Sequence, residues 1–558
     1  MWLRITEIKL PAAELVADKK TEEKDIELAL LKDKVCKVLG FSAEQGRESL
    51  KQIVIYRRSP DLRKKSEPYF VYTVDVKVKY KVKTNKSDIT VITKNENLYD
   101  YYISQLSQKA NKTEARPVVV GFGPAGMFAA LVLAEAGYKP IVLERGQKVE
   151  DRVKSVHNFH KIGQLNVESN IQFGEGGAGT FSDGKLNSLI KDKDTVGRFV
   201  LETFVKFGAP EEILYKNKPH IGTDILRTVV KNIREYIVSK GGEVRFDTKM
   251  TELIISNGRI SGVKTVAASD RLSVKKEIAT ECVILAIGHS ARDTFAKLNE
   301  QKIAMEKKPF SVGVRIEHLQ EKINRSQYGE CDELMRRLNG AADYKLSHRA
   351  SNGRGVYTFC MCPGGFVVGA TSEKGRLVTN GMSNFDRAGR NANAAVLVGI
   401  TPEDFPGEDV LSGVEFQRKL EAAAYSLGGN TWRAPCQLVG DYMLGRESKS
   451  AGKVEPTFSN GYKLADLNEI LPKYVAQALK EGITAFGKKI NGFDDYDAVL
   501  TGCETRSSSP VRILRDDKGN SVSVKGLFPA GEGAGYAGGI LSAAADGIKV
   551  VEKWLDSL

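Results

Sequence analysis

Three glycine-rich segments of the chain match the pattern G-x-G-x-x-G. They lie at residues 121–126, 174–179 and 533–538. Glycines at this spacing permit a tight turn and let the backbone come close to a phosphate, so the pattern is typical of loops that bind the pyrophosphate of a dinucleotide. By itself the pattern is a weak signal. The elements on either side of each loop decide which of the three could bind a phosphate.

The first loop has the surroundings that dinucleotide binding requires. RPVVV before it predicts a buried strand, PAGMFAALVLAEAG after it predicts a helix with proline in its first turn, and KPIVLER predicts a second buried strand. Glu144 ends this second strand, 18 residues after Gly126, where a carboxylate can accept hydrogen bonds from a ribose. The helix N-terminus would face the phosphates. We therefore predict a complete βαβ dinucleotide-binding unit; the alternative is a tight turn without a ligand.

The other two loops lack part of this context. TFSDGKLNSLI, after the second loop, has no helical periodicity, so we predict an irregular loop over GEGGAGTFSDGKL whose amides approach a ligand. A mobile surface loop is the alternative. The third loop lies between a predicted strand, KGLF, and a predicted helix, ILSAAADGIKVVEKWL, but no second strand with a ribose-binding acid follows it. This helix could direct the positive end of its dipole at a group that becomes negative during a reaction.

Longer segments carry a resemblance to known flavoproteins. They are NVESNIQFGEGGAGTFSDGKL, KPHIGTDILR, VYTFCMCPGGFVVGATSE, ETRSSSPVR and GLFPAGEGAGYAGGILSAAADGI. With the glycine loops, they resemble a bacterial family labelled FAD-dependent dehydrogenase, which has no assigned substrate. That family is similar to the glutathione-reductase-like FAD/NAD(P)-binding flavoproteins. The resemblance covers nearly the whole chain and implies FAD as the cofactor.

The resemblance gives each glycine loop a role around one FAD. The first would hold the pyrophosphate, the second would cover the flavin, and the third would direct amides at flavin N1 and O2 and stabilise the reduced anion. Glu144 would bind the ribose, with Arg145 and Met250 beside the adenine. Glu532 departs from the class, which usually has aspartate there on the ribityl chain. His289 could lie near the cofactor or pack as a structural histidine. The implied cofactor-binding residues are Gly121, Gly123, Pro124, Ala125, Gly126, Glu144, Arg145, Gly176, Gly177, Thr180, Met250, Gly288, Gly531, Glu532, Gly538, Gly539 and Ile540.

Three further residues are candidates for catalysis. Lys185, which follows the second loop, could contact flavin N5 or O4. Glu504 and Arg506, in CETRSSSPVR, could bind a substrate carboxylate or move a proton, and a structural ion pair is the alternative. Cys360 and Cys362 could form a redox disulfide, but buried inert thiols are the commoner case. No second Cys or His pair lies nearby to complete a zinc site, so no metal is predicted.

The predicted fold class is α/β. A Rossmann-like FAD-binding domain with a central parallel sheet is interrupted by an α+β substrate or cap domain and preceded by a small α+β domain of βαββ order. In that first domain YTVDVKVKYKV alternates apolar and polar residues, as a half-buried strand does. The predicted segments are 1–85 for the N-terminal domain, 86–112 for a linker with one short helix, 113–294 for the first part of the FAD-binding domain, 295–505 for the insertion, and 506–558 for the C-terminal part of the FAD-binding domain.

Composition narrows the class of protein. The chain has 558 residues, a net charge of +13 and seven scattered cysteines. It shows neither a signal peptide nor an apolar run of the roughly 18 residues that a membrane helix needs, so we expect a cytoplasmic protein with reduced thiols. The expected function is an FAD-dependent oxidoreductase, a dehydrogenase or reductase that transfers a hydride between flavin N5 and an unidentified small molecule, for which an anion is one option. NAD(P)H could donate the electrons, although no second dinucleotide fingerprint supports it.

Two alternatives stay open. An RNA-modifying flavoenzyme could hold RNA with the basic segment RRSPDLRKK and the lysine-rich strand face of the N-terminal domain. A solvated sheet face is the simpler interpretation, because we find no recognised RNA-binding aromatic motif, and neither nucleic acid nor membrane is an expected partner. A non-catalytic FAD-binding partner protein would hold the flavin without turning it over.

Overall fold

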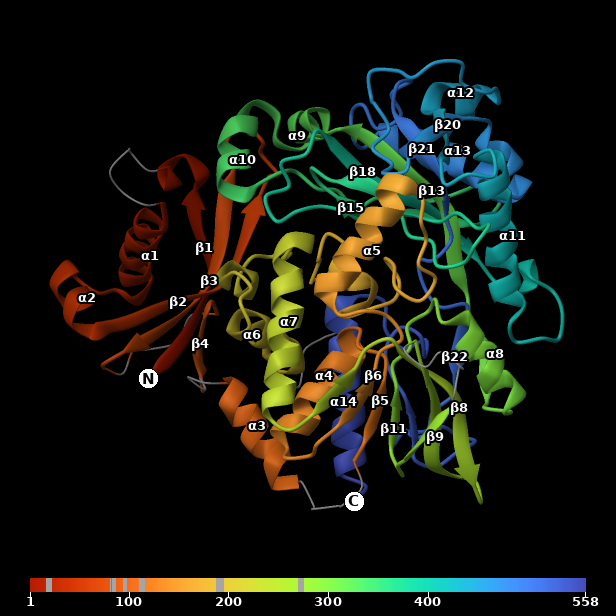
Figure 1. Cartoon of the computed structure of the whole chain (residues 1–558). Coiled ribbons are helices and arrows are strands. Elements are labelled where there is room, and N and C mark those ends of the chain that lie inside the picture. Colours follow the sequence, from red (N-terminus) through yellow and green to blue (C-terminus); the bar gives the residue numbers. More distant parts are fainter. Residues whose placement is uncertain are drawn as a thin grey trace.

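The structure, a computed structural model, has a small N-terminal domain at one side, a central α/β domain, and an inserted domain above the centre (Figure 1). It describes residues 1–16, 23–80, 82, 87–93, 98–109, 116–186, 195–268 and 275–558. Parts of the predicted linker, residues 86, 94–97 and 110–112, lie outside the described residues. Within the described ranges, no helix is long and apolar enough to cross a bilayer.

The central domain is built on a five-stranded parallel sheet in the order β23-β11-β5-β6-β7. Four of its strands, β5, β6, β11 and β23, are apolar and buried throughout, as strands covered on both faces are. The α/β class with a Rossmann-like parallel sheet is therefore confirmed. The strands are β5 (Val118–Val120), β6 (Ile141–Leu143), β7 (Glu243–Arg245), β11 (Val283–Leu285) and β23 (Leu527–Pro529).

Two layers cover this sheet. Because successive side chains of a strand point to opposite faces, Val119 joins the core under five helices, whereas Val118 and Val120 join the core under the antiparallel sheet β10-β9-β8 and helix α8. The helices of the first layer are α3 (Leu98–Lys109), α4 (Pro124–Glu135), α6 (Val196–Lys206), α7 (Thr223–Ser239) and α14 (Ile540–Leu555). The second layer contains β8 (Thr248–Ser256), β9 (Arg259–Ala267), β10 (Lys276–Ala279) and α8 (Arg292–Glu300). Helix α5 (Val149–Ile162) extends from this domain toward the insertion (Figure 1).

The βαβ unit predicted around the first glycine loop consists of β5, α4 and β6. Ten of the twelve residues of α4 are buried, because the helix packs against the sheet, α14 and α7. A Cβ on Gly547 would lie 2.1 Å from the carbonyl oxygen of Ala125, so glycine lets the two helices touch. Ala125 and Ala543, in the first turns of α4 and α14, share a small apolar cluster with Ala286. Both helices therefore begin at the same edge of the sheet.

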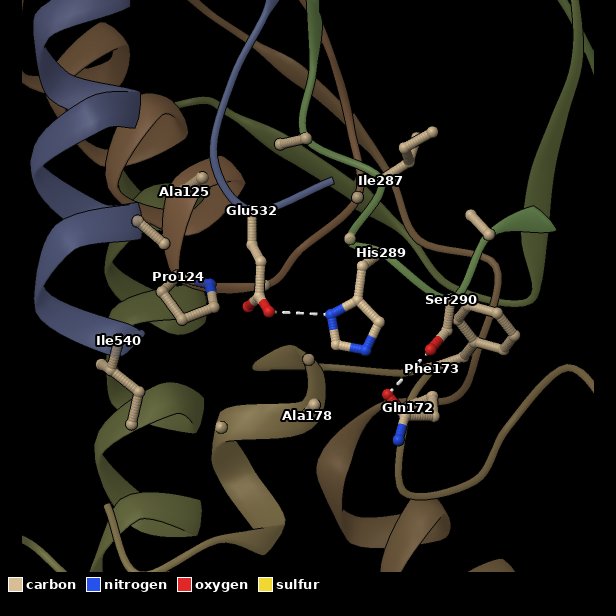
Figure 2. A pocket seen from close by; sticks show the side chains of 18 of the residues that line it. Pro124, Ala125, Gln172, Phe173, Ala178, Ile287, His289, Ser290, Glu532 and Ile540 are labelled. Carbon is tan, nitrogen blue, oxygen red and sulfur yellow. Dashed lines mark hydrogen bonds and ion pairs between the residues drawn. The ribbon is translucent and has the colours of Figure 1, made fainter. Parts of the chain in front are cut away.

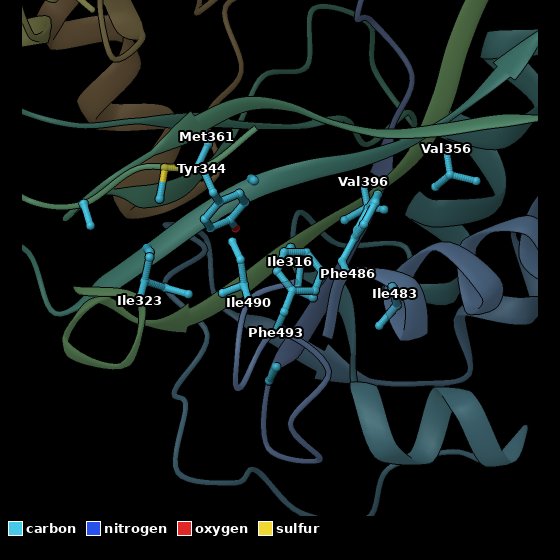
Figure 3. Close-up of a cluster of buried hydrophobic side chains, with 14 of the residues drawn as sticks. Ile316, Ile323, Tyr344, Val356, Met361, Val396, Ile483, Phe486, Ile490 and Phe493 are labelled. Atoms are coloured by element: carbon cyan, nitrogen blue, oxygen red, sulfur yellow. The ribbon is translucent and has the colours of Figure 1, made fainter. Parts of the chain in front are cut away.

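The insertion forms a seven-stranded mixed sheet in the order β14-β15-β18-β13-β21-β19-β20. Its core includes Ile316, Val396, Phe486 and Phe493 (Figure 3). The chain leaves the central domain through β12 (Met305–Lys307) and returns through β22 (Val511–Ile513), which pair with each other. The strands are β13 (Phe310–Leu319), β14 (Ser347–Arg349), β15 (Gly355–Cys362), β18 (Asn391–Ile400), β19 (Ala434–Leu438), β20 (Tyr462–Leu464) and β21 (Val499–Glu504), with the hairpin β16 (Phe366–Gly369) and β17 (Thr379–Met382). The helices are α9 (Gln320–Tyr328), α10 (Asp332–Asn339), α11 (Ser412–Leu427), α12 (Val439–Leu444) and α13 (Lys473–Gly487).

The N-terminal domain is an antiparallel sheet in the order β2-β3-β1-β4, with helices α1 (Glu23–Leu39) and α2 (Ala43–Ser49). On β3 the predicted apolar face is buried from Tyr72 to Val78, but Tyr80 lies beyond the strand and is exposed. The structure places a fourth strand, β4, inside the segment predicted to be a linker, because its residues pair with the edge of β1. The strands are β1 (Trp2–Pro11), β2 (Leu50–Asp61), β3 (Tyr69–Val78) and β4 (Ile89–Ile92).

The N-terminal domain shares a continuous hydrophobic core with the insertion. Arg58 is buried at the junction, where its guanidinium pairs with Glu27 at 2.8 Å and donates to the carbonyl oxygen of Leu338 at 3.1 Å. A buried guanidinium with such partners resists separation of the two surfaces. The N-terminal domain is therefore fixed against the insertion.

Candidate active site

A large cavity lies where the loops after β5, β11 and β23 meet (Figure 2). Residues of the insertion also line it. It holds about 1560 Å³ of empty space, solvent at its mouth included. The predicted cofactor-binding residues that line it are Gly121, Gly123, Pro124, Ala125, Glu144, Arg145, Gly177, Met250, Gly288, Glu532, Gly538, Gly539 and Ile540.

All three glycine loops meet at this cavity. A Cβ on Gly177 in the second loop would lie 3.0 Å from the Cα of Gly123 in the first. A Cβ on Gly179 would lie 3.0 Å from the side chain of Ile540, which follows the third loop. The second loop therefore lies against the other two, and the three repeats of the pattern surround one space rather than three separate sites.

Some of the lining glycines leave room that the protein itself does not use. Apart from their chain neighbours, no atom of the described residues lies within 4 Å of a Cβ placed on Gly538 or Gly539, and a Cβ on Gly123 meets only the Cα of Gly177, at 3.8 Å. Gly123 has φ −75° and Gly539 has φ 165°, which other residues also adopt. Neither backbone shape nor packing requires glycine at these two positions, so the space is available to a ligand.

The N-termini of α4 and α14 adjoin this space. Neither helix has a side-chain cap, and their N-cap residues are Gly123 and Gly539. The amides of a first helical turn lack partners within the helix and attract negative charge. Phosphates bind at such helix ends. The residues present therefore fit FAD, with a phosphate site at one helix and a site for an electron-rich ring at the other.

Four predicted cofactor-binding residues are not among those that line the cavity. They are Gly126, Gly176, Thr180 and Gly531. A Cβ on Gly126 would lie 1.9 Å from the carbonyl oxygen of Gly121, and one on Gly176 would lie 2.0 Å from the hydroxyl of Thr180. Gly176 and Gly531 also have left-handed backbones, with φ 78° and 77°. In the structure, packing requires glycine at positions 126 and 176, and backbone shape requires it at positions 176 and 531.

Glu144 is buried and organises the end of the cavity where the ribose is expected. Its Oε2 accepts from the amide of Phe122 at 2.8 Å, and its Oε1 accepts from the amides of Gly146 and Gly174, each at 2.9 Å. These amides come from the first loop, the segment after β6 and the second loop. Because each carboxylate oxygen can accept two hydrogen bonds, Oε2 retains capacity for a ribose hydroxyl.

Arg145 lies beside Glu144, and each nitrogen of its guanidinium donates to a carboxylate. It donates to Asp293 at 2.8 and 2.9 Å and to Glu168 at 2.7 Å, and it lies 4.1 Å over the ring of Phe173. Burial alone would raise the pKa of Asp293, but the hydrogen bonds and charge of Arg145 lower it to about 2. Arg145 therefore forms a rigid polar wall at this end of the cavity.

The candidate catalytic residues Glu504, Arg506 and Lys185 also line the cavity. Both oxygens of Glu504 accept from Arg315 at 2.8 Å. Burial raises the pKa of Glu504, although Arg315 opposes this shift. Arg506 pairs instead with Glu421 at 3.1 Å. The structure thus places Glu504 and Arg506 in two buried ion pairs with other partners, which supports the structural alternative for both.

Glu421, on α11, was not predicted from the sequence. It is fully buried and contacts Arg292 at 2.7 Å as well as Arg506. Burial alone would raise the pKa of Glu421, but the two guanidiniums lower it. Arg506 also donates to the hydroxyls of Ser290 and Ser372, at 3.1 and 2.6 Å. The network joins the insertion to the loop after β11, and no local sequence signal marks it.

The insertion contributes Phe359, Cys360, Cys362 and Asn380 to the cavity wall. Cys360 has a left-handed backbone, with φ 41°, and its carbonyl oxygen accepts from Arg315 at 2.5 Å. Both cysteines are free thiols; Cys360 is exposed, whereas Cys362 is buried and burial raises the pKa of its thiol. Among the residues that the structure describes, no group of three His, Cys, Asp or Glu side chains could hold a metal.

Comparison with known proteins places the chain in a family. Residues 309–507 match the family described as FAD-dependent protein, C-terminal domain-like. An uncharacterized protein of Clostridium beijerinckii is 48% identical over 533 residues, which cover 95% of this chain and 96% of that protein. The chain belongs to the same family as this protein. The present chain is FAD-dependent. Its segment that matches the family model is the insertion, which faces the glycine loops.

Two other similarities are weaker. A digeranylgeranylglycerophospholipid reductase of Methanocella arvoryzae is 25% identical over 169 residues, 30% of this chain and 38% of that enzyme. A glycerol-3-phosphate dehydrogenase from Bacillus halodurans, solved with FAD, gives a TM-score of 0.34 at 13% identity, over 82% of this chain and 66% of that one. Scores this low carry no weight for the fold, which follows from the sheet order itself. The glutathione-reductase-like class stays an expectation.

Proposed function

We propose that this FAD-dependent protein is an oxidoreductase that transfers a hydride between a small organic substrate and N5 of the flavin. Bound FAD supplies the hydride chemistry, while the protein binds it and shapes its surroundings. One feature supports this most: the glycine loops and the insertion line the same cavity, so a cofactor and a second small molecule can share one space. Ligand sites are common at such junctions between domains.

Three parts of the chain would hold the cofactor. The first turn of α4, after Gly123, offers uncapped amides to the pyrophosphate. Glu144 offers a carboxylate to the ribose, and its own bonds to three amides keep it in place. The first turn of α14, after Gly539, offers amides and the positive end of a dipole to the N1 and O2 edge of the flavin, where they favour negative charge.

We further propose that the substrate is a small anion. Lys185 lies on the cavity wall, and its buried ammonium has no hydrogen-bond partner among the described residues. Asp183 is 3.5 Å away, but it already pairs with Arg387 at 2.5 Å. Lys185 and Arg387 share the single carboxylate of Asp183, whereas Arg315 is balanced by Glu504. One positive charge is therefore in excess. A substrate carboxylate or phosphate would balance it, since an unpaired buried charge is costly.

The first test is a measurement of cofactor and redox activity on the purified protein. We expect a yellow protein that releases FAD, not FMN, on denaturation. Under anaerobic conditions, a screen of metabolites should find an anionic compound that bleaches the flavin band. A protein that takes up no FAD would refute the binding site. A flavin that no donor reduces and no acceptor reoxidises would favour the non-catalytic alternative.

The second test concerns Lys185. Lys185→Met should raise the concentration of the anionic metabolite needed for half-maximal bleaching, and Lys185→Arg should restore part of the effect because it keeps the charge. Lys154→Met, which removes an exposed lysine on α5, is the matched control. Equal behaviour of Lys185→Met and the control would contradict the proposed anion site and leave the redox assignment intact.

A further inference from the structure

His289 and Glu532 meet where the loop after β11 contacts the loop after β23 (Figure 2). Nδ1 of His289 lies 2.8 Å from Oε1 of Glu532. A Cβ on Gly533 would lie 2.5 Å from the carbonyl oxygen of Gly288, so the two loops touch directly. The pair is therefore held by its backbones as well as by its side chains, and both residues line the cavity.

This contact fixes the tautomer that a neutral imidazole of His289 adopts. A carboxylate only accepts hydrogen bonds, so Nδ1 must carry the hydrogen that it donates to Glu532. In a neutral imidazole the other nitrogen, Nε2, is then an acceptor without a proton. The side chain of His289 is 10% exposed, and its Nε2 is buried without a hydrogen-bond partner in the described part of the chain.

A nearby hydroxyl of the protein is already engaged. The Ser290 hydroxyl donates to Oε1 of Gln172 at 3.0 Å, as the dashed line in Figure 2 marks, and it accepts from Arg506 at 3.1 Å. Its proton is therefore not available to Nε2 of His289. A buried acceptor without a partner is costly, and a donor supplied by a ligand in the cavity would remove that penalty.

We infer that His289 binds a hydroxyl group of FAD through Nε2, with Glu532 as the positioning residue that keeps the ring in this orientation and tautomer. An acceptor nitrogen pairs with a hydroxyl and not with a phosphate oxygen. FAD has hydroxyls on its adenosine ribose and on its ribityl chain, and either could be the donor. The inference rests on FAD binding and is independent of the proposed hydride transfer and substrate.

The experiment titrates the full-length apoprotein with FAD. His289→Asn keeps an amide donor near the position of Nδ1 and lacks Nε2, whereas His289→Phe lacks both. We expect FAD affinity to fall by about 2- to 12-fold in His289→Asn, which corresponds to one hydrogen bond of ~0.5–1.5 kcal/mol, and to fall further in His289→Phe. His157→Asn, an exposed histidine on α5, is the matched control and should bind FAD as the wild type does.

Titration with fragments of the cofactor identifies which hydroxyl is bound. ADP carries the ribose and FMN carries the ribityl chain, so we expect His289→Asn to weaken the binding of one fragment only. Two results would overturn the inference. In the first, His289→Asn binds FAD as tightly as His157→Asn. In the second, the His289→Asn substitution weakens the binding of both ADP and FMN, which would indicate a distorted pocket. Neither result bears on the metabolite screen, so failure here is distinguishable from failure of the proposed function.

Discussion

Gly123→Val should abolish FAD binding while the protein remains folded. Gly123 has φ −75° and ψ −176°, which valine can adopt, and the nearest protein atom to a Cβ there would be the Cα of Gly177 at 3.8 Å. The added side chain therefore meets little of the protein. It would enter the cavity directly before the first turn of α4, where the pyrophosphate is expected.

The size of the effect follows from the amides of that first turn. If the branched side chain keeps the pyrophosphate away from two amides, two hydrogen bonds to a charged group are lost, at about 1.5–3 kcal/mol each. Since about 1.4 kcal/mol is a tenfold change in Kd, the combined loss of about 3–6 kcal/mol weakens binding by roughly 10²- to 10⁴-fold. The free energy of unfolding of the apoprotein should change by no more than about 1 kcal/mol, because the backbone is unstrained.

The assay measures FAD affinity of the apoprotein by flavin fluorescence and its stability by urea unfolding. Gly126→Val is the matched comparison, because a Cβ there would lie 1.9 Å from the carbonyl oxygen of Gly121. That variant should lose stability and FAD together. A folded Gly123→Val protein with the FAD affinity of the wild type would show that another loop holds the pyrophosphate, and would refute the reasoning.

Three other substitutions test separate features. Gly539→Leu should lower the reduction potential of the flavin by about 6–40 mV while FAD stays bound. A helix N-terminus stabilises a negative charge by about 0.3–2 kcal/mol, and about 1.4 kcal/mol corresponds to ~30 mV for a two-electron couple. An unchanged potential in a redox titration would show that α14 does not face the flavin. Glu421→Ala should reduce the free energy of unfolding by about 3–5 kcal/mol, because it removes the buried carboxylate that Arg292 and Arg506 share and leaves them only the partly exposed Glu373. Glu415→Ala, at an exposed side chain of the same helix, should change it by at most about 0.5 kcal/mol in the same denaturant series. Arg145 lowers the pKa of Asp293 to about 2 against the effect of burial, so the ionised carboxylate stabilises the fold at pH values above about 4 and loses this contribution as pH falls toward 2. Over this range the free energy of unfolding of the wild type should therefore fall more steeply than that of Asp293→Asn. Equal slopes for the two proteins would contradict the ion pair.

Elements that depend on neighbouring residues were predictable from the sequence. The first loop, α4 and β6 follow one another directly, and their apolar runs and the proline at the start of α4 act over a few positions. The alternation in β3 likewise predicted its buried face, from Tyr72 to Val78. β4 was missed because it is four residues long and pairs with β1, which lies more than 80 positions earlier in the chain.

The sequence by itself determined that one complete βαβ unit exists and placed Glu144 at the end of its second strand, where the structure has it directly after β6. The resemblance already implied that the three glycine loops surround one FAD. Only the tertiary structure decided that Glu504 pairs with Arg315 and that Arg506 pairs with Glu421. The physical reason is the separation along the chain between the residues that interact. Turns, caps and helices form between residues a few positions apart, whereas ion pairs and cavity walls depend on distances across the fold, which the order of the parallel sheet and the place of the insertion set.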